Sequence, residues 1–250
     1  MESYDVIPNI IHFIVGIEKD DYPFLFISYL SILSSYLINK PNKIYIWYNH
    51  LPNGKWWDKT LKIKNTELKK IKVQKKFNNK EILDINHKKD FLKINILYNY
   101  GGIYLNLNTI SLRSYRSILT DSTVMIRKNE NEVYSNFIGS PLKSNFFKLW
   151  IQEYLEKFSS FETNKCSEKI PLELLMKHNS KLELLSEVYN KSNNNNDVFS
   201  KKITIPPQTL FLSLENCDKK LKSIGDIEWA NKNKNTLLGK IILKLIKYNV

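Results

Sequence analysis

The chain has 250 residues, a length that suits one α/β domain or a domain with a small appendage. Hydrophobic residues make up 42 % and aromatic residues 12 % of the sequence, so the chain can bury a sizeable core and is not a disordered tail. The formal net charge of +13 attracts phosphates, acidic polymers and anionic membranes, although a Lys- and Asn-rich composition also arises from an AT-rich coding sequence. No nucleic-acid motif accompanies the charge, and nucleic acid is not expected as a partner.

Cysteine use and the N-terminus bear on the compartment. Cys166 and Cys217 lack the spacing of metal ligands and do not form a disulfide framework, and the sequence leaves open whether they pair. Glu2 and Asp5 stand where a signal peptide carries positive charge, and no cleavage site follows. We therefore expect a cytoplasmic or peripheral membrane location.

The first elements alternate between strand and helix. Residues 7–15 form a β-branched apolar run that predicts a strand, and residues 43–48 alternate as a second strand. Residues 22–39 carry no charge and approach the length of a membrane span, but they include four serines. Their leucines recur at helical spacing, which favours a buried helix over residues 23–38. Residues 61–76 are compatible with a short strand or a helix.

The middle of the chain continues the pattern. Residues 87–100 predict a helix with an apolar stripe, and the Gly-Gly pair at 101–102 predicts a tight turn into a buried strand at 103–107. Residues 145–158 predict another amphipathic helix. The alternation indicates an α/β sheet with helices on both faces. In open sheets of this kind ligands bind beyond the carboxyl ends of strands, where residues 106–108 lie.

The last third of the chain is less regular. Residues 192–197 predict a loop, and residues 203–211 predict a strand interrupted by two prolines. We divide the chain into a main domain of residues 1–235 and a basic amphipathic helix of residues 236–250. Two roles stay open for this helix, because its apolar face is suited to a membrane surface and equally to closing the core.

One long motif carries the functional signal. The chain reads His-Lys-Lys-Asp-Phe-Leu-Lys at residues 87–93 and Leu-Tyr-Asn-Tyr-Gly-Gly-Ile-Tyr-Leu-Asn-Leu-Asn at residues 97–108. This string resembles glycosyltransferase family 32, the DXD-containing sugar transferases that include fungal α-1,6-mannosyltransferases and are akin to large clostridial glucosylating toxins. The family pattern is His-Lys-Ala-Asp-x-x-Arg followed by Leu-Tyr-x-Tyr-Gly-Gly-Ile-Tyr-Leu-Asp-x-Asp. The resemblance is clear over roughly residues 5–150 and implies a GT-A fold, with a Rossmann-like mixed sheet flanked by helices.

The sequence departs from the family at the metal site. In the family the Asp-x-Asp motif holds a divalent ion, usually Mn²⁺, on the donor diphosphate, whereas this chain has Asn106 and Asn108. Hard cations prefer anionic oxygens, and one charge pair at 4 Å contributes roughly 4 kcal/mol at moderate dielectric. We therefore expect Mn²⁺ binding to be weakened or lost. The basic residues that are candidates to replace the metal are Lys88, Lys89, Lys93 and Arg113.

The resemblance also implies a donor-binding set for a UDP- or GDP-sugar. Asp90 matches a family residue that binds sugar hydroxyls, and Lys93 replaces a family Arg. Because the residue types also suit structural roles, Asp90 is alternatively a helix N-terminal acid, and His12 and Tyr104 are alternatively core residues. The aromatic residues Trp56, Trp57 and Trp229 are weaker candidates, and His87 is expected to stabilise a turn. The full donor-binding set is His12, Asp90, Lys93, Tyr104, Asn106 and Asn108.

Three functions follow from these patterns. The first is a hexosyltransferase that moves sugar from a nucleotide sugar to a glycan or protein acceptor with retention of anomeric configuration. The second is a pseudoenzyme of the same fold that binds a nucleotide sugar, a glycan or a protein without turnover, which the Asn-Leu-Asn motif favours. The third is a basic binder of nucleic acid or membrane surfaces, which only the charge supports.

Overall fold

The fold is described from a computed structural model that defines residues 6–18, 23–77, 80–158, 165–178, 181–186, 197–200, 205–214 and 218–248. Most of the loop predicted at residues 192–197 lies outside these residues, as does Cys217. Among the described helices, none is long and apolar enough to cross a membrane.

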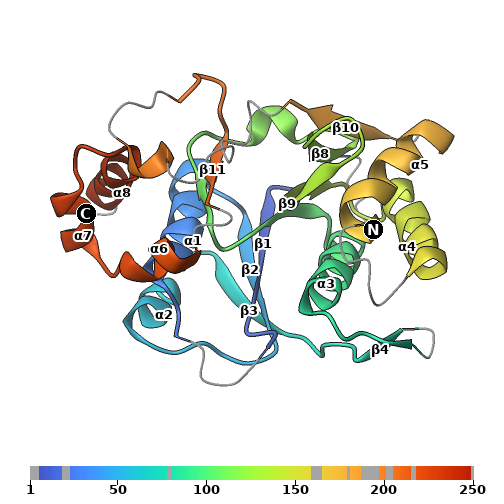
Figure 1. The fold of residues 1–250 in the computed structure, drawn as a ribbon, viewed down its shortest axis with the longest axis horizontal. Coiled ribbons are helices and arrows are strands. Elements are labelled where there is room, and N and C mark those ends of the chain that lie inside the picture. Colours follow the sequence, from blue (N-terminus) through green and yellow to red (C-terminus); the bar gives the residue numbers. More distant parts are fainter. Residues whose placement is uncertain are drawn as a thin grey trace.

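A seven-stranded sheet in the order β10-β8-β9-β6-β1-β2-β3 forms the centre of the fold (Figure 1). The strands β6, β1, β2 and β3 are mutually parallel, whereas β9 is antiparallel to both of its neighbours. The mixed α/β sheet predicted from the sequence is therefore confirmed. The strands are β1 (Ile10–Val15), β2 (Lys43–Tyr48), β3 (Thr66–Lys70), β6 (Gly102–Leu105), β8 (Thr123–Arg127), β9 (Val133–Ser140) and β10 (Leu182–Leu185).

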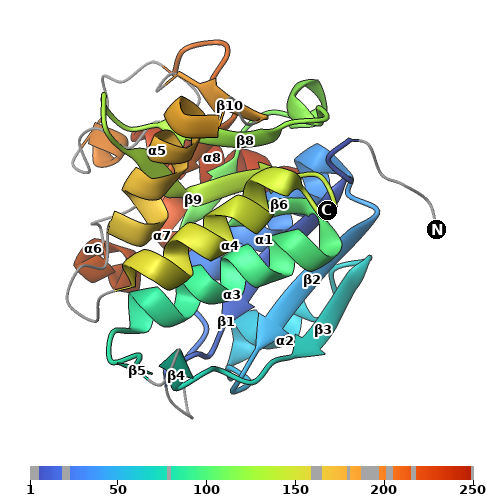
Figure 2. The same ribbon diagram turned by 90° about the vertical axis from the view of Figure 1, so that its right-hand side faces the viewer.

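Helices cover both faces of this sheet, and each face has its own apolar cluster. One face carries α1 (Phe26–Asn39), α2 (Lys55–Thr60), α6 (Asp218–Ser223), α7 (Ile227–Lys232) and α8 (Leu237–Lys247). The other carries α3 (Ile85–Tyr100), α4 (Asn145–Lys157) and α5 (Ile170–His178), which Figure 2 shows in front of the sheet. Smaller elements are the pairs β4 (Lys76–Phe77) with β5 (Lys80–Glu81) and β7 (Thr109–Ser111) with β11 (Phe211–Ser213), a π-helix at Lys165–Lys169, and 3-10 turns at Arg116–Ile118 and Asp197–Phe199.

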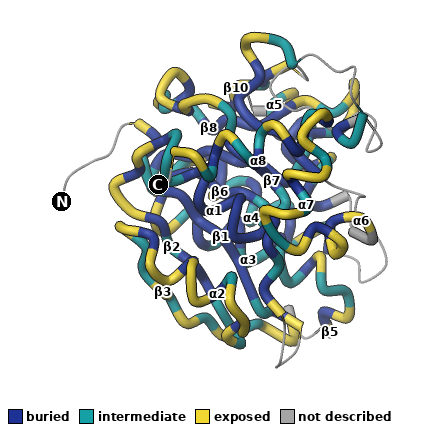
Figure 3. Tube along the Cα trace, turned by 90° about the vertical axis from the view of Figure 1, so that its left-hand side faces the viewer, coloured by how far each residue is buried: buried dark blue, intermediate teal, exposed yellow. Residues whose placement is uncertain are grey.

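The serine-rich segment is a buried helix, as predicted. Most of α1 is buried, and Figure 3 shows its trace in the dark interior beside β1. Its serines form hydrogen bonds to the segment that follows β6. The Ser31 hydroxyl donates to the Thr109 carbonyl at 2.6 Å, and Ser34 Oγ accepts from the Ser111 backbone N–H at 3.0 Å. These polar contacts explain why a helix with an uncharged sequence suits the interior of this protein rather than a bilayer.

Three predicted strands have different bounds in the structure. The strand expected at 7–15 begins only at Ile10. The strand expected at 203–211 is wrong, because the strand of this region is Phe211–Ser213 and the residues before it, where described, form a turn. The strand expected at 103–107 ends at Leu105, since the Thr109 N–H donates to the Asn106 carbonyl at 3.1 Å and closes a turn. The open assignment at 61–76 is resolved as strand β3 followed by β4.

The C-terminal helix α8 packs into the core. Leu238, Ile242 and Leu245 are buried in the cluster that also contains the apolar face of α1. The Thr236 side chain caps the helix by accepting from the Gly239 N–H at 3.1 Å. Of the two roles left open by the sequence, the apolar face thus performs the core-closing one.

Candidate active site

A cavity lies where the strand order reverses. Strand β1 has β2 on one side and β6 on the other. Helix α1, which leads from β1 to β2, covers one face of the sheet, and α3, which leads into β6, covers the other. Such a switch point opens a crevice at the carboxyl ends of the strands. A cavity of about 650 Å³ occupies this position, a size typical of small-molecule sites. Its walls come from β1, α1, α3, β6, β9, the segment before α5, and α6.

A buried ion pair forms one wall of the cavity. Lys93 Nζ lies 2.8 Å from Asp90 Oδ1, and the two side chains are only 7 % and 6 % exposed. The spacing of three residues places both side chains on the same face of α3. The Lys93 ammonium also donates to the Ser135 carbonyl at 3.2 Å and lies 5.1 Å from the centre of the Tyr104 ring. These contacts fix the position of the Asp90 carboxylate at the cavity.

The two asparagines of the motif lie on the turn after β6, and both line the cavity. The Tyr104 hydroxyl donates to Asn106 Oδ1 at 2.6 Å, and Asn106 N–H donates to the Asn136 carbonyl at 3.1 Å. The Leu214 N–H donates to the Asn108 carbonyl at 3.0 Å. The turn is thus held by β6 itself, by β9 and by the segment after β11. Because residues 106–108 turn, they do not continue the extended strand that the sequence predicted.

The chemistry of this donor set does not fit a divalent metal ion. Asn106 Oδ1 already accepts the Tyr104 hydroxyl, and Asn108 Oδ1 is buried without a hydrogen-bond partner among the described residues. The Asp90 carboxylate is paired with Lys93. No group of three or more His, Cys, Asp or Glu side chains with metal-ligand geometry occurs in the described part of the chain. Mn²⁺ prefers carboxylate, carbonyl and water oxygens, and the two amide oxygens offer no negative charge.

His12 is not among the residues that line the cavity. Its ring is fully buried, with Nε2 lying 2.7 Å from the Gly101 carbonyl, while Nδ1 accepts from Trp47 Nε1 at 3.1 Å. An indole nitrogen only donates, so the neutral Nε2–H tautomer satisfies both contacts. Burial lowers the pKa of His12 to about 4, although the hydrogen bond to Gly101 opposes this change. The structure therefore gives His12 the core role that the sequence left as an alternative.

The Gly-Gly turn predicted after α3 is present, and it needs glycine at both positions. Gly101 has φ +61° and Gly102 has φ +95°, in the region that side chains disfavour. A Cβ at Gly102 would stand 2.6 Å from the Ile10 carbonyl oxygen and 2.9 Å from His12 Nε2. The turn thus brings β6 against β1 and starts the strand that carries Tyr104.

The other sequence candidates divide between the cavity and the core. Lys89 lines the cavity, whereas Lys88 and Arg113 do not. His87 is buried and lies 2.8 Å from the Tyr154 hydroxyl, so it joins α3 to α4. The tryptophans lie outside the cavity: Trp56 donates to the Gly225 carbonyl and packs on Phe26, Trp57 packs on Phe24, and Trp229 contacts Phe199.

Sequence reasoning missed three contributors to the site. Lys222 on α6 lines the cavity, and no ion pair of this lysine is found within the described residues. Ser28 lines the cavity from the start of α1, and Ser135 contributes the carbonyl that accepts from Lys93. The row of serines on α1 was a signal for contacts of this kind, but nothing near Lys222 in the sequence points to the cavity.

The comparisons with known proteins agree with this geometry. Residues 30–125 match the family model described as the glycosyltransferase sugar-binding region containing the DXD motif. The matched region includes α3, β6 and the turn with both asparagines. A search of solved structures finds GlyE, a glycosyltransferase of Streptococcus pneumoniae TIGR4, with a TM-score of 0.56 and 14 % identity over 97 % of this chain and 60 % of that chain.

The chain is similar to the DXD glycosyltransferases and has a GT-A fold. A curated relative, glucan organizing enzyme 1 of Cryptococcus neoformans var. grubii serotype A, is 26 % identical over 198 residues, which are 73 % of this chain and 53 % of the relative. The bifunctional glycosyltransferase WbbM aligns with a TM-score of 0.50 at 8 % identity over 98 % of this chain and 52 % of that chain. The chain thus spans about half the length of the curated relative it matches.

Proposed function

We propose that this chain is a sugar transferase that binds a UDP- or GDP-sugar in the cavity at the carboxyl ends of β1 and β6 and transfers the sugar to a glycan or protein acceptor. The observation that carries the proposal is the convergence of the motif residues. Asp90 and Lys93 from α3, Tyr104 from β6 and both asparagines of the turn line one cavity of about 650 Å³.

The sugar-binding end of the cavity is built around Asp90. Its carboxylate accepts hydrogen bonds from sugar hydroxyls, and an ionised acceptor makes these bonds stronger than a neutral one does. Lys93 is a positioning residue, because it holds one oxygen of this carboxylate at 2.8 Å. The buried Asn108 Oδ1 is a further acceptor for which the described residues provide no donor.

The phosphates of the donor are neutralised by lysines in place of a metal ion. The cavity is lined by Lys89, Lys93 and Lys222 and by three acids. Asp90 is paired with Lys93 at 2.8 Å and Glu168 with Lys128 at 2.7 Å, whereas Lys89 lies 3.9 Å from the exposed Glu18. Lys89 and Lys222 are thus the cations available to an incoming diphosphate. An ammonium group neutralises a phosphate as a point charge and needs no anionic ligands of its own.

The reaction that we propose retains the anomeric configuration. The bond between the anomeric carbon and the donor phosphate oxygen breaks, and a bond to the acceptor hydroxyl oxygen forms on the same face. The hydroxyl proton passes to the departing phosphate oxygen, and the nucleoside diphosphate leaves. No protein side chain acts as a general base in this scheme, and the lysines stabilise the charge that develops on the leaving group.

The test is release of UDP or GDP from a panel of nucleotide sugars by the full chain, with EDTA present. We expect release that EDTA leaves unchanged, and a loss of about tenfold or more in Lys222→Gln, since a charge-assisted contact to phosphate contributes about 1.5–3 kcal/mol. Lys240→Gln on α8 is the matched control, because it removes the same charge from an exposed helix position outside the cavity. Binding of the nucleotide sugar without release by any variant would support the pseudoenzyme function instead.

A further inference from the structure

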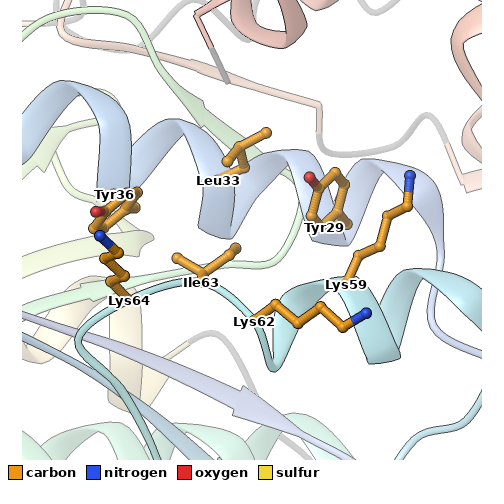
Figure 4. A pocket seen from close by; sticks show the side chains of 7 residues that line it. All are labelled: Tyr29, Leu33, Tyr36, Lys59, Lys62, Ile63 and Lys64. Carbon is orange, nitrogen blue, oxygen red and sulfur yellow. The ribbon is translucent and has the colours of Figure 1, made fainter. Parts of the chain in front are cut away.

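A second cavity lies between α1 and the stretch of chain from Lys59 at the end of α2 to Lys64 before β3. It has a volume of about 350 Å³ and is lined by seven residues from these two segments (Figure 4). Tyr29, Leu33 and Tyr36 occupy positions i, i+4 and i+7 of α1, so they share one face of that helix. Ile63 faces them from the other segment, and Figure 4 shows it opposite Leu33.

The floor of this cavity is apolar and its rim is cationic. Leu33 is 1 %, Tyr29 7 % and Ile63 9 % exposed, and Tyr36 is half-buried. The rim consists of Lys59, Lys62 and Lys64, and all three are exposed.

The charge of the rim is not balanced. The seven lining residues include no acid, and no ion pair of the three lysines occurs within the described residues. Three ammonium groups around one hollow repel one another, and an anion in the hollow relieves this repulsion.

This cavity is separate from the candidate active site, because the two share no lining residue. The active site uses Leu25, Ile27 and Ser28 from the first turn of α1 and the residue before it, whereas the second cavity uses the helix from Tyr29 onward. A ligand in the second cavity therefore leaves the donor cavity accessible.

We propose that the second cavity binds a sugar ring that carries a phosphate or carboxylate group. The lysines of the rim pair with the anionic group, and the apolar floor accepts the C–H face of the ring. The half-buried Tyr36 provides aromatic surface together with a hydroxyl group, a combination that suits a ligand with both apolar and polar faces. The volume exceeds what a bare phosphate ion needs and is within the range of small-molecule sites.

The concave shape favours this ligand over a membrane or a nucleic acid. A flat anionic bilayer reaches the exposed lysine tips but does not contact Tyr29, Leu33 and Ile63 on the floor, which are at most 9 % exposed. Base stacking on single strands requires an open aromatic face, whereas Tyr29 is only 7 % exposed. A compact anionic ring enters the hollow and contacts both the rim and the floor.

The experiment measures binding of glucose 6-phosphate to the full chain by calorimetry, with glucose and inorganic phosphate as separate probes. We expect glucose 6-phosphate to bind more tightly than either. Lys59→Gln/Lys62→Gln/Lys64→Gln should weaken binding about tenfold or more, since each surface charge pair contributes up to about 1 kcal/mol.

Two control variants match this change. Lys240→Gln/Lys244→Gln/Lys247→Gln removes the same charge from α8, and Lys222→Gln removes a cation from the active-site cavity. Both should leave the affinity for glucose 6-phosphate within about twofold of wild type, since these lysines lie outside the second cavity.

Each of five outcomes contradicts the proposal. Equal weakening by both triple variants indicates attraction by net charge alone. Equal affinity for phosphate and glucose 6-phosphate indicates a bare anion site. Weakening by Lys222→Gln as large as that by the rim variant places the ligand in the active site. No binding of glucose 6-phosphate, together with lysine-dependent binding to vesicles containing phosphatidylserine, indicates a membrane contact. Full affinity of a Tyr36→Ala variant for glucose 6-phosphate indicates that the Tyr36 side chain does not contact the ligand.

Discussion

The buried pair of Asp90 and Lys93 allows a quantitative test of the site. Lys93→Met removes a cation 2.8 Å from Asp90 Oδ1 and leaves an almost fully buried carboxylate without its partner. Removing one member of a buried pair costs about 3–5 kcal/mol of folding stability, because the remaining charge is desolvated without compensation. Asp90→Asn removes the carboxylate charge beside the buried Lys93 ammonium, which still contacts the Ser135 carbonyl and the Tyr104 ring, so a similar loss is expected.

The double variant Asp90→Asn/Lys93→Met separates this effect from simple loss of packing. If the pair acts as a unit, the double variant loses less stability than the sum of the single variants, by about 2–3 kcal/mol. Urea unfolding followed by circular dichroism measures the three losses. A coupling energy below about 0.5 kcal/mol would refute the idea that Lys93 holds Asp90 through their ion pair.

Three further predictions concern the framework of the site. His12 should remain the neutral Nε2–H tautomer down to low pH, with an NMR titration midpoint near pH 4; a midpoint near 6.5 contradicts this. Because its pKa is lower in the folded than in the unfolded chain, neutral His12 contributes stability on the order of 3 kcal/mol above pH 6.5, which should be lost as the pH falls from 6.5 through 4. Gly102→Ala should lose about 2 kcal/mol or more because its Cβ meets the Ile10 carbonyl, whereas Gly225→Ala, with open space around it, should unfold like wild type in the same urea titration. Ser31→Ala should lower the free energy of unfolding by about 1 kcal/mol, because it removes the hydrogen bond to the Thr109 carbonyl. It should also lower nucleotide release in the folded protein, because this bond holds the turn of Asn106 and Asn108; unchanged release would refute that coupling between helix α1 and the turn.

The strands and helices that the sequence predicted well are those with one clear pattern. Residues 43–48 alternate, and β2 has these bounds. The amphipathic helix expected at 145–158 is α4, Asn145–Lys157. The strand after the Gly-Gly turn ended early because its end depends on a hydrogen bond between Asn106 and Thr109. The sequence shows only that asparagine is compatible with either an extended strand or a turn at this position.

The lining of the cavity was predictable where its residues belong to one continuous motif. Asp90, Lys93 and Tyr104 lie within fifteen residues of one another, and the motif gave them all. Lys222 lies more than one hundred residues away and reaches the cavity only through the packing of α6, which no local pattern reveals. The alternation of residues in β1 does not show that the ring of His12 fits between Trp47 and Gly101. Contacts of this kind depend on tertiary structure.

Metal-free sugar transfer is tested most sharply by nucleotide release from UDP- and GDP-sugars by the full chain, with EDTA or with added Mn²⁺. We predict release that is unaffected by EDTA, not increased by Mn²⁺, and lost in Asp90→Asn. Release that disappears with EDTA and returns with Mn²⁺ would show that Asn106 and Asn108 still hold a metal ion, and would contradict the assignment of the phosphate-binding role to lysines.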